Sequence, residues 1–121
     1  MTNKEIVLQF YDEVFNGWDL SHLDRYMKES YIQHNPNAES GRQGFVKFAE
    51  GFLALKPHMD IVHIAADGDM VFVFFKCTLA NGAINKVCDI YRLEDGMLAE
   101  HWDVIEHNVN DVVPLHGNGL F

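Results

Sequence analysis

The stretch 86-KVCDIYRLEDGMLAEHWDVIEH-107 contains two runs of alternating apolar and polar residues around the turn signal Glu94–Gly96. Alternation at every second residue is typical of β-strands with one buried face, and a glycine after acidic residues favours a hairpin. His101 and Asp103 lie two positions apart, so their side chains point to the same face of a strand. The stretch predicts an antiparallel hairpin with ionisable side chains gathered on one face.

The hairpin extends upstream into a four-strand meander. From Pro57 onward the hydrophobic period is two, and "DGD", "NG" and "EDG" turn signals divide this half of the chain. The expected strands cover residues 58–66, 70–80, 83–93 and 97–107.

The first half of the chain has a helical period instead. Apolar residues recur at helical spacing over Asn3–Phe15 and Arg42–Leu55, and residues 19–27 (DLSHLDRYM) predict a short helix between them. Residues 30–36 (SYIQHNP) favour a short extended segment that ends at a proline. Helices followed by an antiparallel sheet predict an α+β fold in which three N-terminal helices pack on one face of the sheet.

Length and composition are those of one globular domain, residues 1–121. Hydrophobic residues make up 48% of the chain, enough for a substantial core. The net charge of −9 and the lack of a basic cluster argue against nucleic acid and membrane surfaces as partners. Neither a signal peptide nor a membrane span is expected, so we expect a cytoplasmic protein with Cys77 and Cys88 reduced.

Turn chemistry sets the expected register of the sheet. A two-residue turn at Asn81–Gly82 pairs Ala80 with Ala83, which places Phe74 opposite Asp89 and Phe72 opposite Tyr91.

A three-residue loop at Glu94–Gly96 pairs Leu93 with Met97 and places Asp89 opposite His101. A two-residue turn there would move Asp89 to the other face, opposite Trp102. With the three-residue loop, one face carries Asp89, Tyr91, His101, Asp103, Phe72 and Phe74.

The opposite face is expected to be apolar at its centre. Its apolar members under this register are Val71, Val73, Phe75, Leu79, Ile90, Trp102 and Val104. Helices on one side of the sheet leave such a patch uncovered, and a second copy of the chain would cover it. We therefore expect a homodimer packed sheet to sheet.

Asp89, His101 and Asp103 are the candidate catalytic residues. A carboxylate in an apolar cavity is costly unless it is paired or hydrogen-bonded, and such an environment suits a general base or acid. The alternative is a hydrogen-bonded pair of Asp89 and His101 that only closes the core. The pattern of residues leaves both interpretations open.

Three segments together resemble the SnoaL-like polyketide cyclases of the nuclear-transport-factor-2-like superfamily, whose fold is a cone-shaped α+β structure. They are "FYDEVFNGWDLSHLDRYM", "YIQHNP" and "KVCDIYRLEDGMLAEHWDVIEH". The similarity covers about residues 4–107 and leaves 108–121 as a C-terminal extension. Its most specific part is R-x-x-D-G-x-x-x-E/D-H-x-D, from Arg92 to Asp103.

The resemblance implies a cofactor-independent enzyme. In the family's cyclases the aspartate that ends H-x-D removes a proton next to a carbonyl and starts an aldol ring closure; the matching residue is Asp103. The cyclases carry a histidine where this chain has Asp89. The family's Tyr-x-Asn-Pro cavity segment is approximated by Tyr31, Asn35 and Pro36, with additional residues between them.

A small hydrophobic carbonyl compound is the expected ligand, converted by aldol cyclisation or double-bond isomerisation. Asp103 or Asp89 would act as base, with hydrogen-bond donors aimed at the enolate oxygen. Besides these, the expected substrate-binding residues are His34, Asn35, Tyr91, Phe72, Phe74, Phe10 and Phe48.

Two other functions stay open: a non-catalytic ligand-binding domain of the same fold, and an epoxide or ester hydrolase. The hydrolase is less favoured because Arg92 is expected to face away from the carboxylates. No metal is expected, since the histidines show no familiar ligand spacing.

Overall fold

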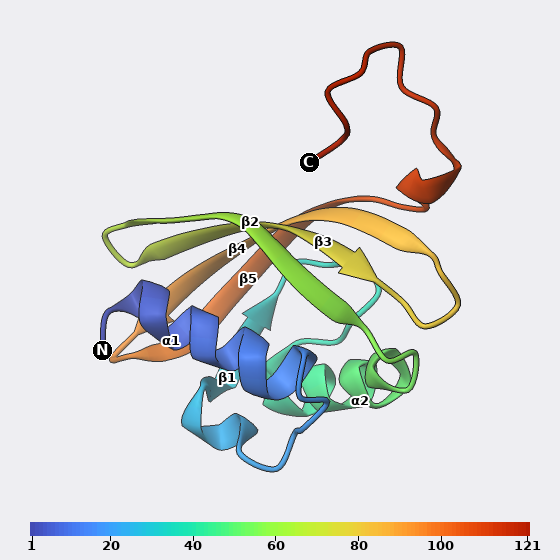
Figure 1. Ribbon diagram of the computed structural model, residues 1–121. Helices are drawn as coiled ribbons and strands as arrows, with labels where there is room; N and C mark the ends of the chain where they lie inside the picture. Colours follow the sequence, from blue (N-terminus) through green and yellow to red (C-terminus); the bar gives the residue numbers. More distant parts are fainter.

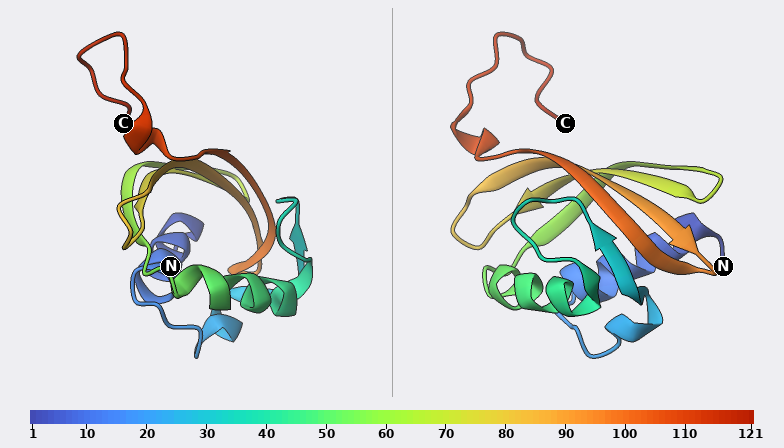
Figure 2. Two further views of the ribbon diagram at one scale, coloured as in Figure 1. Left: turned by 90° about the vertical axis from the view of Figure 1, so that its right-hand side faces the viewer. Right: turned by 180° about the vertical axis from the view of Figure 1, so that it is seen from behind.

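The computed structural model describes all residues, 1–121, and contains one five-stranded sheet with the strand order β1-β5-β4-β3-β2. The strands are β1 (Met27–Gln33), β2 (His58–Asp67), β3 (Met70–Thr78), β4 (Ile84–Glu94) and β5 (Met97–Glu106). Strands β2 to β5 form the expected antiparallel meander, and β1 adds to the edge in parallel with β5. The sheet curves over two helices, as the end-on view shows (Figure 2).

Helices α1 (Asn3–Phe10) and α2 (Gly41–Leu53) lie on the concave side of the sheet (Figure 1). A capping box between Thr2 and Glu5 begins α1. The last turn of this helix widens into a π-helical turn, η1 (Tyr11–Phe15), in which the Asn16 amide donates to the Tyr11 carbonyl over 2.9 Å. Neither α1 nor α2 combines the length and apolar character needed to span a bilayer.

The third expected helix is not present, so this part of the α+β prediction is wrong. Residues 19–27 form only a 3-10 turn, η2 (Leu23–Arg25), before β1 begins at Met27. The Asp19 carboxylate accepts hydrogen bonds from the Ser21 amide and hydroxyl, which holds the chain in a local turn. Such side-chain to backbone bonds compete with helix formation.

Strand β3 is shifted by one residue from the expected register. The turn before β4 has three residues, 80–82, because the Leu79 amide bonds to the Ala83 carbonyl and Gly82 takes a φ of 89°. Val73 therefore pairs with Asp89, and Val71 pairs with Tyr91. A one-residue shift exchanges the two faces of a strand.

Because of this shift, the residues of β3 that were expected on one face of the sheet lie on the other. Val71, Val73 and Phe75 are buried on the concave side, where they pack into the core, and Leu79 lines a cavity there. Phe72 and Phe74 alternate with them and so lie on the convex side.

In the β4–β5 hairpin the side chains point to the expected faces, but the turn and the pairing differ from the prediction. Its turn has two residues, Asp95 and Gly96, both with positive φ, and Glu94 pairs with Met97. The register then shifts, because Leu93 pairs with Leu98 while Arg92 pairs with Glu100. This leaves one extra residue, Ala99, in β5, which is the definition of a β-bulge.

Because of the bulge, Asp89 faces Asp103 directly and Tyr91 faces His101. The sequence prediction that Asp89, His101 and Asp103 share one face therefore holds. The expected partner of Asp89 was His101, which is wrong by one pair.

The C-terminal extension follows a short 3-10 turn, η3 (Val109–Asp111), and rises on the convex side of the sheet (Figure 1). Its last ring, Phe121, lies 6.1 Å from the ring of Phe74 and 5.8 Å from the Lys76 ammonium. The end of the extension therefore lies against the convex face of the sheet, which the helices do not cover.

Candidate active site

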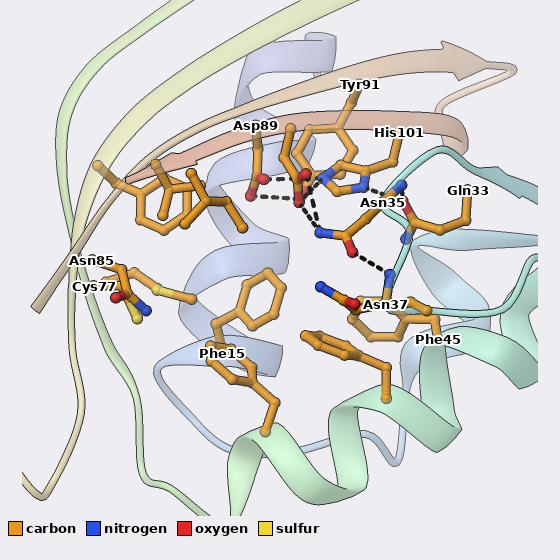
Figure 3. A pocket seen from close by; sticks show the side chains of 18 of the residues that line it. Phe15, Gln33, Asn35, Asn37, Phe45, Cys77, Asn85, Asp89, Tyr91 and His101 are labelled. Atoms are coloured by element: carbon orange, nitrogen blue, oxygen red, sulfur yellow. Dashed lines mark hydrogen bonds and ion pairs between the residues drawn. The ribbon is translucent and has the colours of Figure 1, made fainter. Parts of the chain in front are cut away.

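A cavity of about 250 Å³ lies between the concave face of the sheet and α2. Fourteen of its 22 lining residues are hydrophobic, with Phe45, Phe48 and Phe52 contributed by α2. Asp89 and Tyr91 of β4 and His101 of β5 gather at one end of the cavity, together with Asn35 from the segment after β1 (Figure 3). This end is the candidate active site.

Asp89 is buried at the end of the cavity, and both of its carboxylate oxygens accept hydrogen bonds. Oδ1 lies 2.9 Å from His101 Nε2, and Oδ2 accepts from the Tyr11 hydroxyl. The Tyr91 hydroxyl lies 3.2 Å from the same Oδ2 and 3.0 Å from the Tyr11 oxygen. Three surrounding donors are the arrangement that stabilises a buried carboxylate in its charged form.

Gln33 determines which nitrogens of His101 carry protons. The Gln33 Oε1 atom accepts from the backbone amides of His34 and Asn35, at 3.0 and 2.9 Å, which identifies it as the oxygen. His101 Nδ1 lies 2.7 Å from this oxygen and must donate to it. A second proton must then lie between His101 Nε2 and Asp89, so the two residues form a hydrogen-bonded pair in which the imidazolium–carboxylate form has the most donors to support it.

Asp103 has a different environment. Its two oxygens lie 3.0 and 2.8 Å from one donor, the Asn35 side-chain nitrogen, and Oδ2 is 3.9 Å from His101 Nε2. Asn35 is itself oriented, because its Oδ1 accepts from the Asn37 amide at 2.8 Å. Asp103 is also less buried than Asp89. It is therefore the carboxylate with unused acceptor capacity facing the cavity.

The tyrosines around Asp89 are held in their neutral, donating form. Burial raises the pKa of Tyr11 and of Tyr91 well above the usual 10.0, and the negative charge of Asp89 raises both further. Burial also raises the pKa of Tyr31, again with Asp89 as the second cause. Each phenol therefore keeps its proton wherever the fold is intact.

These shifts predict a fold that loses stability in alkali. Burial, and then the charge of Asp89, raise the pKa of the Cys77 thiol from 9.0 to about 12. Above about pH 9 the unfolded chain loses protons that the native state keeps, so the free energy of unfolding falls by roughly 1.4 kcal/mol per pH unit for each such group. Denaturant unfolding followed by fluorescence between about pH 8 and 11 measures this slope.

The Cys77→Ala variant is the matched control. Without the Cys77 thiol, the decline above about pH 9 is expected to be shallower, because only the Cys88 thiol, whose pKa burial also raises, contributes there before the tyrosines do near about pH 10. A free energy of unfolding that stays constant from about pH 8 to 11 in both proteins would contradict these buried protonation states.

Of the expected substrate-binding residues, Asn35, Tyr91 and Phe48 line the cavity. Phe10 does not: it is fully buried in the core and contacts the rings of Tyr11 and Tyr91 from behind. His34 lies outside the cavity, stacked on Trp102 at 4.8 Å and 2.7 Å from a Glu100 oxygen.

The prediction that Phe72 and Phe74 bind the substrate is wrong. They lie on the convex face because of the shift in β3, and Phe74 stacks on His63 rather than on a ligand. Val73 and Phe75 occupy the concave positions instead, and Phe75 lines the cavity.

Two functional contacts were not predicted, those of Tyr11 and Gln33. Tyr11 belongs to the apolar stripe of the first helix, which predicts that it is buried but not what its hydroxyl contacts. The π-helical turn leaves Tyr11, Val14 and Phe15 all buried, and only the three-dimensional arrangement brings the Tyr11 hydroxyl to Asp89, 78 positions away. Gln33 was present in the "YIQHNP" segment, but nothing in the sequence distinguished it as the partner of a histidine.

The same cluster is where a cation could bind. Ligand atoms of Asp89, His101 and Asp103 lie within 4.8 Å of one another, which the sequence spacing did not reveal. In the structure, however, His101 and two tyrosine hydroxyls already satisfy both oxygens of Asp89. A metal would have to displace a proton from His101 Nε2, so the donor set fits a hydrogen-bonded acid–base cluster better than a preformed metal site.

Comparison with known proteins places the chain in a family. The SnoaL-like domain family matches residues 7–101, which is most of the chain. The chain therefore belongs to the SnoaL-like domain family. A search of curated proteins gave no significant match.

Solved structures show the same fold. A candidate polyketide cyclase from Acidithiobacillus ferrooxidans has a TM-score of 0.77 at 22% identity, over 86% of this chain and 87% of that one. IdmH, a candidate polyketide cyclase from Streptomyces antibioticus, has a TM-score of 0.75 at 18% identity over 88% and 93%.

AclR, a candidate hydroxylase from Streptomyces galilaeus, has a TM-score of 0.73 at 23% identity over 86% and 88% of the two chains. At these identities the comparisons establish the fold. The names also show that different reactions are associated with it.

Proposed function

We propose that the protein is a cofactor-independent acid–base enzyme that enolises a small carbonyl compound and directs it to aldol cyclisation or double-bond isomerisation. The observation that carries the proposal is the unequal state of the two carboxylates. Asp89 is saturated with donors, whereas Asp103 faces an apolar cavity and is held by one amide. Two acids with different environments are a common basis for acid–base roles.

In the proposed reaction, Asp103 takes a proton from the carbon next to the substrate carbonyl. The C–H electron pair moves into the new C=C bond, and the carbonyl π electrons move to the oxygen as an enolate. His101, charged and fixed between Asp89 and Gln33, stabilises that developing negative charge at the same end of the cavity. Preorganised charge in a site with apolar walls is worth more than in water.

The second half of the reaction distinguishes the two outcomes. In an aldol closure, the enolate carbon forms a bond to a second carbonyl of the same molecule, and protonated Asp103 returns the proton to the alkoxide. In an isomerisation, Asp103 returns the proton to a different carbon of the conjugated system. Both outcomes leave the protein unchanged and need no cofactor.

Hydrolysis has less support. Arg92, which would be needed beside the carboxylates, pairs with Glu100 at 2.9 Å and with Glu94 at 2.5 Å, away from the cavity. The remaining alternative, a domain that binds but does not react, makes the opposite prediction in the experiment that follows.

Exchange of α-hydrogens in deuterated water tests enolisation without knowledge of the natural substrate. β-Tetralone is a suitable probe because it is a flat, uncharged bicyclic ketone with acidic α-hydrogens. Proton NMR is expected to show that the protein accelerates loss of the α-signals above the buffer rate. Binding of the ketone with no acceleration would favour a binding domain instead.

We also propose that the convex face of the sheet forms a homodimer. On this face Val104 of β5 is 69% exposed and Phe72 of β3 is 38% exposed, and Val113 and Leu115 of the C-terminal extension are more exposed than either. Large apolar side chains exposed in this number are typical of a protein interface.

Sedimentation equilibrium is expected to give twice the chain mass for the wild type. Val104→Glu would place a charge in the interface and is expected to yield monomers. Leu8→Glu, on the exposed side of α1, is the matched control and should remain dimeric. A monomeric wild type, or a dimer unaffected by Val104→Glu, would argue against this interface.

A further inference from the structure

The cavity has a second polar end, opposite the acid–base cluster. Along the concave face, Asn85, Val87 and Asp89 alternate on β4, and all three line the cavity. Four residues of strand separate Asn85 from Asp89, which corresponds to about 13 Å at ~3.3 Å per residue. Phe75, Val87 and Ile105 form the apolar wall between these two ends.

Asn85 is oriented so that its donor is free. Its Oδ1 accepts from the Asn108 amide at 3.1 Å, where the chain leaves β5 with a positive φ. The side-chain nitrogen has no hydrogen-bond partner in the protein. In Figure 3, Asn85 lies beside Cys77, on the other side of the cavity from Asp89 and His101. The cavity therefore offers an acceptor for a C–H proton at one end and a free N–H donor at the other.

Charge is distributed just as unevenly. No lysine or arginine lines the cavity, whereas two aspartates do. Two imidazoles line the cavity: His101 is already paired with Asp89 at 2.9 Å, and His107 is exposed to solvent. An anionic group at the Asn85 end would lie in a largely apolar space, away from His101 and without a lysine or arginine beside it, while Asp103 adds a negative charge to the same cavity. Burying such a group is costly.

From these observations we infer that the ligand is an uncharged, elongated and flat molecule with a carbonyl at the Asp103 end and a second hydrogen-bond acceptor that reaches Asn85. Carboxylates and phosphates are excluded as ligands, and Asn85 determines specificity at the far end. This inference rests on the proposed function for the position of the reacting carbonyl. The phenylalanines of α2 supply the flat apolar contact along the length of the molecule.

Three ketones test the inference by isothermal titration at about pH 8, where free histidine side chains are uncharged. They are β-tetralone, its derivative with a methoxy group on the ring carbon farthest from the carbonyl, and the corresponding carboxylate. The methoxy compound is expected to bind about threefold to tenfold more tightly than β-tetralone, the range for one added neutral hydrogen bond. The carboxylate is expected to bind at least about tenfold more weakly than the methoxy compound.

Variants of Asn85 provide the matched comparison. Asn85→Asp keeps an oxygen for the Asn108 amide but removes the donor, so the methoxy preference is expected to disappear while β-tetralone binds as before. Asn85→Lys supplies a cation at the far end and is expected to raise affinity for the carboxylate above that of the wild type. Equal binding of the carboxylate and the methoxy compound by the wild type overturns the inference, as does a methoxy preference that survives in Asn85→Asp.

Deuterium exchange of plain β-tetralone separates this inference from the proposed function, because that probe has no group that reaches Asn85. Accelerated exchange without the predicted ligand preferences would support the proposed enzyme and contradict the proposed ligand class. The predicted ligand preferences without accelerated exchange would support the proposed ligand class and contradict the proposed catalysis.

Discussion

Replacing Asp103 with asparagine is expected to lower the rate of α-hydrogen exchange in β-tetralone by about 10²- to 10⁴-fold, the usual contribution of a general base. Asn keeps the size of the side chain and an oxygen for the Asn35 amide, so the cavity retains its shape. What disappears is the only carboxylate with free acceptor capacity in the site. Proton NMR in deuterated water, at equal concentrations of folded protein, measures the effect.

Gln33→Glu and Phe48→Leu serve as comparisons for that result. Gln33→Glu keeps an oxygen for His101 Nδ1 and leaves Asp103 in place, so a large part of the exchange rate should remain. Phe48→Leu changes only the apolar wall and should act mainly through ligand affinity. An Asp103→Asn variant that exchanges β-tetralone within a factor of two of the wild type would refute the assignment of the base.

Replacing Asp89 with asparagine is expected to have its main effect on stability. The amide would place an N–H group among His101 Nε2, Tyr11 and Tyr91, all of which donate to Asp89 in the native protein. Removing one partner of a buried ion pair costs about 3 to 5 kcal/mol. Urea unfolding should therefore show a midpoint far below that of the wild type, with a similar slope.

Asp103→Asn is the matched control for this measurement. Asp103 lies 3.9 Å from His101, and an asparagine there keeps an oxygen for the Asn35 amide, so the same chemical change is expected to cost about 1 kcal/mol, the net value of one hydrogen bond. The two substitutions thus predict opposite profiles, with catalysis lost in one and stability lost in the other. An Asp89→Asn protein as stable as the wild type would show that the donors around Asp89 do not hold an ion pair.

The convergence of Asp89, His101 and Asp103 could be predicted because it depends on a period of two. The alternation from Val87 to Ile105 is strong enough to fix which residues share a face of β4 and of β5. The details of pairing could not be predicted, because a two-residue turn plus a bulge at Ala99 and a three-residue loop give the same facing. Only the exact partner of Asp89 differs between them.

Between β3 and β4 no bulge offsets the error in the predicted turn length, so the predicted faces of β3 are wrong. The "NG" signal at Asn81–Gly82 fits a two-residue turn, but the chain forms a three-residue loop with only Gly82 at positive φ. Strand β3 is apolar on both faces, so its hydrophobic pattern does not reject the wrong register. For this reason the sequence predicts that Phe72 and Phe74 contact the ligand, although they lie on the convex face.

The contacts made by Tyr11 illustrate a different limit. Helical periodicity correctly placed it on the buried side of the first helix, but a buried tyrosine hydroxyl needs a partner that periodicity cannot name. The π-helical turn that follows α1 changes the angular spacing of Tyr11 and Phe15 relative to an ideal helix. Side-chain clusters assembled from α1, β1, β4 and β5 are visible only in the folded chain.

Fold comparison and site geometry carry different parts of the account. The family and the solved structures establish the fold, and the names of those structures include candidate cyclases and a candidate hydroxylase. The proposed chemistry rests on this chain's own residues, above all on the buried Asp89 and its hydrogen bond to His101. In the proposed function, this pairing makes His101 the fixed cation of the site and leaves Asp103 as its base.

The carboxyl carbon resonances of Asp89 and Asp103, followed by NMR while β-tetralone is added, test this central claim most directly. They report which carboxylate meets the ligand even if turnover is slow. If Asp103 faces the reacting carbonyl, its resonance moves in proportion to the bound fraction, whereas that of Asp89, enclosed by His101 and the two tyrosines, stays in place. Movement of the Asp89 resonance with a stationary Asp103 would contradict the account.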